Sequence, residues 1–215
     1  MSFVLGKPID SLLVKQVEAR QKILGNSDRV VEGDYSFFLQ KMPWIKLTSA
    51  INVGSSDELA RLNILTNGIN LAGSSEVAGY QDTSLGIRPK PGITSMNLNT
   101  HNRYGSLRTA TVQFIIHSVE QLNIYEQLFM RPGYSALLEW GHSKYLDAKT
   151  SAYKVKDIPT LIDFFKGEGS PKTKTELYGK IDALRKEYNY NYDGMYGLIK
   201  NFSWSIQQDG TYAVV

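Results

Sequence analysis

Between Gly105 and Trp140 the hydrophobic pattern changes period and predicts a strand, a helix and a second strand in close succession. Apolar and polar residues alternate over Thr109–Ile116, which is typical of a half-buried strand. Ser118 is expected to be the N-cap of the following helix, with Gln121 completing a capping box. Apolar residues then recur at helical spacing and form one predicted buried stripe, made of Val119, Leu122, Tyr125 and Phe129.

The tripeptide Arg131-Pro132-Gly133 is predicted to end that helix in a sharp turn. Pro132 has no N–H to donate and disfavours helical geometry at Arg131, while Gly133 can adopt the positive φ of a tight turn. Tyr134–Trp140 is then expected to be extended, and two adjacent leucines within it indicate a strand that is covered on both faces. The three elements together form the central packing unit.

Residues 1–43 are assigned to an N-terminal helix and a linker. The helix is expected over Pro8–Leu24, and its apolar side docks either on its own domain or against a neighbouring subunit. A β-rich core over residues 44–142 begins with a predicted strand at Trp44–Val53. A helix from Ser55 through Leu65 is expected next, because Ser55 and Glu58 have the spacing of a capping box.

Residues 71–92 are rich in glycine, proline and serine, which predicts a long surface loop that contacts partners. Ile93–His101 alternates again and is expected to be a strand. A turn over residues 102–105 would return the chain to the strand at Thr109–Ile116, so the two strands should pair as a hairpin.

A helical insertion is assigned to residues 143–197. One short helix is expected at Asp157–Phe165, and a second begins at the N-cap Thr173. The apolar stripe predicted for the second helix consists of Leu177, Ile181, Leu184 and Tyr188. The polar-aromatic segment Tyr188–Gly194 is expected to be a packed or subunit-facing loop, with base stacking on nucleic acid as the alternative.

Residues 198–215 are predicted to return to the core as a β-hairpin. Its first strand, Leu198–Ile206, would place Phe202 and Trp204 on one apolar face, and a turn at 208–210 leads into Thr211–Val215. An apolar strand at this position would leave an exposed edge, so the chain is expected to continue beyond residue 215. The predicted class is α+β, with an antiparallel barrel-like core, a flanking helix and the helical insertion.

Charge and composition exclude several classes of function. The 24 basic and 21 acidic residues nearly balance, so no basic stripe indicates a DNA-binding face. The absence of cysteine excludes disulfides, thiolate zinc sites and cysteine nucleophiles. No apolar run approaches the ~20 residues that span a bilayer, so a soluble protein without membrane insertion or a visible export signal is expected.

The candidate catalytic residues are few. None of the three histidines has the spacing of a helical metal site. Glu139, Trp140, Gly141 and His142 bring a carboxylate near an imidazole, but we interpret them as a packing tryptophan at a strand end with solvated neighbours. No catalysis, metal or cofactor is predicted. A glycosidase carboxylate pair has no fixed sequence spacing, so a cell-wall hydrolase stays open as an alternative.

Several short segments together resemble a family of large structural proteins from tailed phages. They are spread over about half of the chain and consist of fold-determining motifs rather than chemical ones. The segments are 91–95 (PGITS), 105–112 (GSLRTATV), 121–122 (QL), 128–133 (LFMRPG), 137–141 (LLEWG), 201–205 (NFSWS) and 209–212 (DGTY).

The resemblance implies a baseplate or tail-hub protein of a contractile-tailed phage, with the barrel and flanking helix of tail-tube and hub subunits. It also implies a location in the virion after assembly in the host cytoplasm, a homo-oligomeric ring, contacts to other tail proteins, and DNA only as passing cargo. The ring would hide strand edges by pairing neighbouring subunits. Alternatives are a peripheral baseplate wedge or tail-terminator protein and, from another class, a hub-associated cell-wall hydrolase.

Overall fold

The computed structural model describes residues 43–51, 64–67, 80–83, 86–101, 107–142, 144–147, 152–155, 173–188 and 190–215, with five isolated helical residues at 11, 14, 15, 17 and 18. Most of the N-terminal helix, the helix expected at Asp157–Phe165 and the turn at 102–105 lie outside the described residues. Val17, which belongs to the expected Pro8–Leu24 helix, is 47% exposed.

By its internal contacts the chain divides into two compact units, and each is described by itself. The larger consists of Trp44–Trp140, Ile158–Pro171 and Gly194–Val215, and the smaller of Met1–Pro43, Gly141–Asp157 and Lys172–Asp193.

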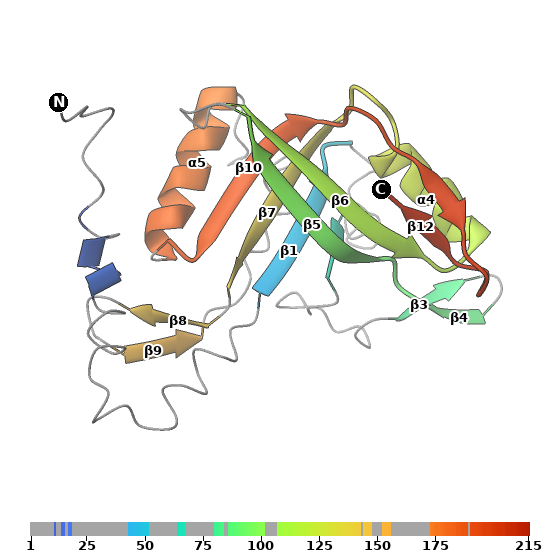
Figure 1. The fold of residues 1–215 in the computed structure, drawn as a ribbon, viewed down its shortest axis with the longest axis horizontal. Helices are drawn as coiled ribbons and strands as arrows, with labels where there is room; N and C mark the ends of the chain where they lie inside the picture. The colour runs from blue at the N-terminus through green and yellow to red at the C-terminus, as the bar shows by residue number, and fades with distance from the viewer. Residues whose placement is uncertain are drawn as a thin grey trace. The chain divides into compact units, whose positions relative to one another are not determined.

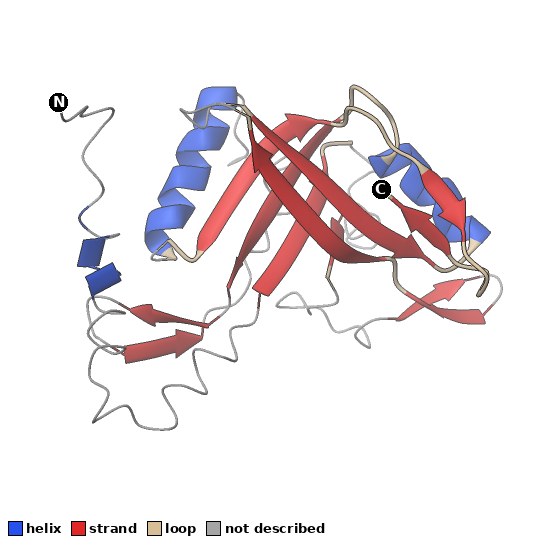
Figure 2. Cartoon of the chain, in the orientation of Figure 1, coloured by secondary structure: helices blue, strands red, loops and turns tan. Residues whose placement is uncertain are grey.

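The main architectural element is an eight-stranded mixed sheet with the order β10-β7-β1-β2-β5-β6-β12-β11. β1 with β2, β5 with β6, β6 with β12 and β12 with β11 pair antiparallel, but β2 and β5 run parallel, with Thr66 opposite Gly92. Figures 1 and 2 show these strands. Their bounds are β1 Pro43–Ser49, β2 Ile64–Thr66, β5 Gly92–Thr100, β6 Arg108–Ile116, β7 Ser135–His142, β10 Tyr192–Leu198, β11 Trp204–Ile206 and β12 Tyr212–Val214.

The α+β class is confirmed, whereas the closed barrel is not found. The strand order has two ends, β10 and β11, and closure would require these end strands to pair with each other. The sheet is therefore open. β12 was expected to expose an edge, but it lies between β6 and β11, and Val214 is 1% exposed. The edge position belongs to β11 instead.

The predicted hairpin of β5 and β6 is present in the sheet (Figure 1). Its register runs from Gly92 opposite Ile115 to Thr100 opposite Arg108, with one irregularity between Ile93 and Ser95. Exposed and half-buried positions alternate along β6, which confirms the period-two prediction for this strand.

Helix α4 (Val119–Phe129) covers one face of the sheet and encloses the core. Ser118 is its N-cap, as predicted, and its Oγ accepts from the Gln121 N–H at 3.2 Å. The core contains Tyr125, Leu128 and Phe129 of α4, with Leu65, Ile93, Phe114, Ile116, Met130 and Val214 around them. The predicted stripe was wrong at its first position: Val119 is 55% exposed, and Gln121 is buried in its place.

The turn after α4 follows its predicted chemistry. The Tyr134 N–H donates to the Arg131 carbonyl at 3.2 Å, so Pro132 and Gly133 occupy the two central positions. Gly133 has φ +89°, as the third position of a type II turn requires. β7 then begins at Ser135, and Leu137 and Leu138 are both buried, which confirms a strand covered on both faces.

Two predictions in the first half of the core were wrong. Ile64 and Leu65 were expected to end a helix, but they form β2 and pair with β1. Strand pairing on both sides outweighs local helical spacing in so short a segment. The predicted loop at 71–92 contains a hairpin of β3 (Tyr80–Thr83) and β4 (Gly86–Pro89).

The smaller unit contains α5 (Lys174–Glu187) and the hairpin of β8 (Lys144–Asp147) and β9 (Ala152–Val155). Thr173 is the N-cap of α5, as predicted, and Leu177 and Ile181 are buried. The insertion is not purely helical, because it includes β8, β9 and most of β10. The rings of Tyr188 and Tyr192 are buried and lie 5.9 Å apart, so this segment is packed.

Candidate assembly surface

The exposed face of the β5–β6 hairpin carries only uncharged polar side chains over three successive cross-strand pairs. Ser95 lies opposite Gln113, Asn97 opposite Thr111, and Asn99 opposite Thr109, and all six residues are exposed. The Ser95 hydroxyl donates to Gln113 Oε1 at 2.8 Å. The alternate residues on the same strands, Met96, Leu98, Ala110 and Val112, are half-buried. The hairpin therefore has one apolar face and one neutral hydrophilic face.

The second exposed feature is the edge strand β11. Ser203 and Val215 exchange two backbone hydrogen bonds of 2.9 Å, and the Gln207 N–H donates to the Thr211 carbonyl at 2.8 Å. Because bonded and non-bonded pairs alternate in an antiparallel ladder, the backbone groups of Trp204 and Ile206 point away from β12. β11 thus presents an edge to which another strand can pair.

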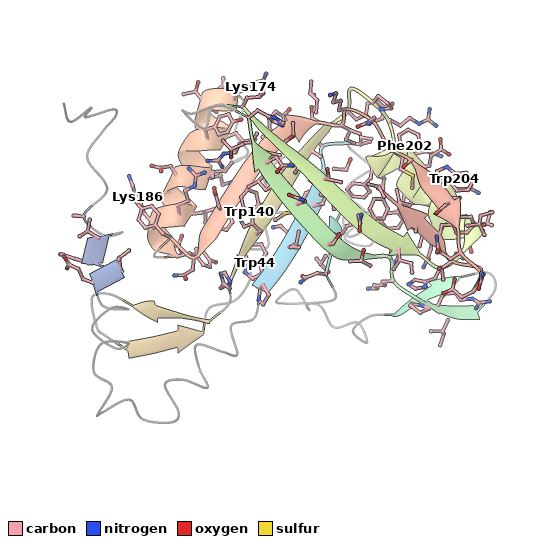
Figure 3. All side chains as sticks on the ribbon, viewed as in Figure 1. Trp44, Trp140, Lys174, Lys186, Phe202 and Trp204 are labelled. Atoms are coloured by element: carbon pink, nitrogen blue, oxygen red, sulfur yellow. The ribbon has the colours of Figure 1, made fainter. Side chains whose placement is uncertain are left out.

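Large apolar side chains lie along this edge. Trp204 is 47% exposed and Ile206 is 65% exposed. Trp204 lies opposite Val214 of the core and contacts the Tyr212 ring edge-to-face at 5.8 Å. Figure 3 labels Phe202 and Trp204 on this part of the chain. Phe202 and Trp204 were predicted to share one apolar face of a strand over Leu198–Ile206, but β10 ends at Leu198 and β11 begins only at Trp204. β11 lies at the outer end of the sheet, and its three residues are exposed.

The turn that supports this edge is held by Asp209. Its Oδ1 accepts from the N–H of Thr211 at 3.0 Å and from its hydroxyl at 2.7 Å, and Gly210 has φ +81°. These hydrogen bonds hold the pKa of the Asp209 carboxyl below its usual range, with His117 contributing further. Burial lowers the pKa of His117, and the nearby Asp209 charge opposes that shift.

A buried ion pair joins β1 and β7. Lys46 of β1 and Glu139 of β7 are both 0% exposed, and Lys46 Nζ lies 2.6 Å from Glu139 Oε2. Burial lowers the pKa of Lys46, while the carboxylate of Glu139 acts in the opposite direction. Glu139 was predicted to be solvated, and that prediction was wrong. Its side chain is on the same buried side of the sheet as Lys46 and is part of the packed interior instead of facing solvent.

Gln121 connects the start of α4 to two other segments. Its Oε1 accepts from the His117 N–H at 3.0 Å, and its Nε2 donates to the Pro89 carbonyl at 2.9 Å. The residue was expected to close a capping box onto Ser118 itself. Its carbonyl instead reaches one residue further back, and its amide binds the end of β4. Sequence gives no sign of the second contact, because Pro89 is distant along the chain.

The other predicted structural residues occupy varied environments. Arg131 forms an exposed ion pair with Glu126 at 3.2 Å, and Gly133 donates its N–H to the Ile199 carbonyl at 2.8 Å. Trp140 is half-buried and Gly141 is buried within β7. Within the described residues no group of three or more side chains could hold a metal ion, and no helix there is long and apolar enough to cross a membrane.

Comparison of the chain with protein-family models, with curated proteins and with solved structures finds no match.

Proposed function

We propose that the protein is a structural subunit of a phage tail baseplate hub, which assembles around the tail axis and connects the tail tube to baseplate components. It carries no catalysis of its own in this proposal. The observation that supports this proposal most directly is the neutral hydrophilic face of the β5–β6 hairpin, defined by the three pairs from Ser95–Gln113 to Asn99–Thr109.

A channel for DNA makes unusual demands on its wall. Lysine or arginine side chains would bind the DNA phosphates, with release of counterions, and this binding would slow the passage of the DNA. Carboxylates would repel the duplex. Hydroxyl and amide groups keep the wall hydrated without a net charge. The six exposed side chains of this hairpin meet that requirement, and in the proposed ring they face the lumen.

The subunit also needs surfaces that bind other subunits. The edge strand β11 offers backbone hydrogen-bonding groups next to exposed Trp204 and Ile206, and the sheet is open. The motifs that resemble tail proteins coincide with the elements that build this scaffold: the type II turn at Arg131–Gly133, the buried strand β7 and the β11–β12 hairpin.

Electron cryomicroscopy of particles that contain the chain tests the proposal. We expect density for a ring of copies on the tail axis, with the β5–β6 hairpin lining the channel. Density away from the axis would contradict the hub and favour the wedge or terminator alternative. A solitary protein that degrades peptidoglycan would favour the hydrolase alternative instead.

The neutral lining can be tested separately with the double variant Asn97→Lys/Thr111→Lys. We expect slower DNA release from particles that carry it, and faster release again as salt is raised, because screening weakens phosphate binding. Two lysines at exposed neutral positions of α5, Thr175→Lys/Ala183→Lys, provide the matched control for added charge. Release that is equally slow in both variants would contradict the lumen position of the hairpin.

A further inference from the structure

The sequence around β11 has the same pattern in both directions. Phe202-Ser203-Trp204-Ser205-Ile206 is apolar, serine, tryptophan, serine, apolar, with Trp204 at the centre. We propose that β11 pairs antiparallel with β11 of a second copy of this chain, around a two-fold axis at Trp204. The contact goes beyond the proposed function and does not rest on it.

The backbone of β11 is oriented for this pairing. The backbone groups of Ser203 and Gln207 bind β12, so the backbone groups of Trp204 and Ile206 point away from the sheet. With the axis at Trp204, the two Trp204 residues form a hydrogen-bonded pair across the interface. Because the same outward groups occur on both strands, each donor meets an acceptor.

The register is determined by the side chains. Phe202 lies opposite Ile206 of the second copy, so the large apolar residues meet on one face. Ser203 lies opposite Ser205 of the second copy on the other face. Beyond the strand, the same register places Lys200 of each copy opposite Gln208 of the other, which is the residue before Asp209. A shift by two residues would place Phe202 opposite Gln208 and leave apolar surface exposed.

The pairing also covers surface that is costly to expose. Trp204 and Ile206 lie on the side of β12 that carries Val214, so they extend the apolar face of the core beyond β12. A second copy brings the same residues to the same face and protects both edges from non-specific pairing. An isologous contact is self-complementary and closes on itself, so it describes the free subunit rather than the contacts within a ring.

Charge variants at the axis test the pairing. For the purified full chain we expect the mass measured by light scattering and sedimentation to rise toward twice the monomer mass with concentration. Trp204→Glu and Trp204→Lys each place like charges opposite one another and should each stay monomeric. An equimolar mixture of the two should recover the dimer, because opposite charges then face each other. Ile87→Glu, at a residue that is 72% exposed on β4, is the matched control and should dimerise like the wild type.

Disulfide trapping tests the register and keeps Trp204 intact. The chain contains no cysteine, so each introduced thiol is unique. Ser203→Cys mixed with Ser205→Cys should cross-link, because directly opposite residues in a non-hydrogen-bonded pair have Cα atoms about 4.5 Å apart. Each variant alone should cross-link at least tenfold more slowly, because its two thiols are diagonal, about 7–8 Å apart.

Three results would overturn the proposal. The first is a wild-type chain that stays monomeric at all concentrations. The second is a dimer that persists in both charge variants. The third is cross-linking that is equally fast in the single variants and in the mixture. None of these results depends on a phage particle, so failure here is distinct from failure of the proposed function.

Discussion

Lys46 Nζ lies 2.6 Å from Glu139 Oε2, and neither side chain is exposed to solvent. The two residues belong to β1 and β7, which are neighbours in the sheet. Removing two charges from water is expensive, so such a pair persists only when its members compensate each other closely. The contact therefore specifies which strand lies beside which, because any other neighbour would leave one buried charge without its counterion.

Breaking this pair should be far more costly than replacing it. Lys46→Met or Glu139→Leu alone should lower the free energy of unfolding by about 3–5 kcal/mol, because one buried charge loses its partner. The double variant Lys46→Met/Glu139→Leu should recover a large part of that loss. Urea denaturation of all four proteins gives the double-mutant cycle. The exposed pair of Arg131 and Glu126 is the matched control, and Arg131→Met should cost less than about 1 kcal/mol.

The two tryptophans on these strands should respond differently to truncation. Trp44 is 2% exposed, so Trp44→Ala should cost about 3–5 kcal/mol, whereas Trp140 is half-buried and its loss should cost clearly less. Both residues are labelled in Figure 3. Chemical denaturation at matched protein concentration gives both values. A midpoint unchanged by Trp140→Ala would contradict the placement of β7 in the sheet.

Gln121 should be more important for stability than any exposed glutamine of α4. Gln121→Leu leaves the His117 N–H and the Pro89 carbonyl without this partner, so a loss of about 2–6 kcal/mol is expected, at about 1–3 kcal/mol for each group. Gln127→Leu, at an exposed position on the same helix, should change stability by no more than about 0.5 kcal/mol. Equal losses in the two variants would show that helix propensity, not the tertiary contacts, determines the result.

Alkaline pH should destabilise the fold through Tyr125. Burial raises the pKa of Tyr125 to about 12, above its ordinary value near 10. The folded state therefore holds the phenol proton more tightly, so this contribution is complete below pH 10 and is lost as the pH rises from 10 to 12. Because the folded and ordinary pKa values differ by about two, the free energy of unfolding should fall by about 2–3 kcal/mol over this interval.

Tyr125→Phe removes this contribution and should flatten the fall in stability between pH 10 and 12. Urea midpoints measured across that interval provide the comparison with the wild type. Tyr134→Phe, at an exposed ring, controls for the loss of a phenol at the surface. An unchanged slope in Tyr125→Phe would mean that other groups govern alkaline unfolding.

Features that depend on local chemistry were predictable. Ser118 and Thr173 cap their helices because a side-chain oxygen needs only an N–H three residues away. Gly133 adopts a positive φ because the turn itself requires it. The alternation of β6 is as clear in the burial of its side chains as in its sequence. In each case the partners lie within a few residues.

Features that depend on partners distant along the chain were not predictable from the sequence. The Ser49 hydroxyl donates to the Leu128 carbonyl at 2.8 Å, across 79 positions of sequence, and no local pattern indicates it. Ile64–Thr66 became a strand because β1 and β5 lie on either side of it. Trp204 is exposed because β11 is the last strand of the sheet, although its apolar pattern resembles that of a core strand.

The sequence by itself therefore determined the α+β class, the caps, the type II turn and the strands of the β5–β6 hairpin. Only the tertiary structure decided that the sheet is open, that Glu139 and Gln121 are buried, and that apolar residues lie on an exposed edge. The physical reason is that hydrogen bonds and side-chain periodicity act over a few residues. Burial and strand order depend on which distant segments meet, and this is a property of the whole fold.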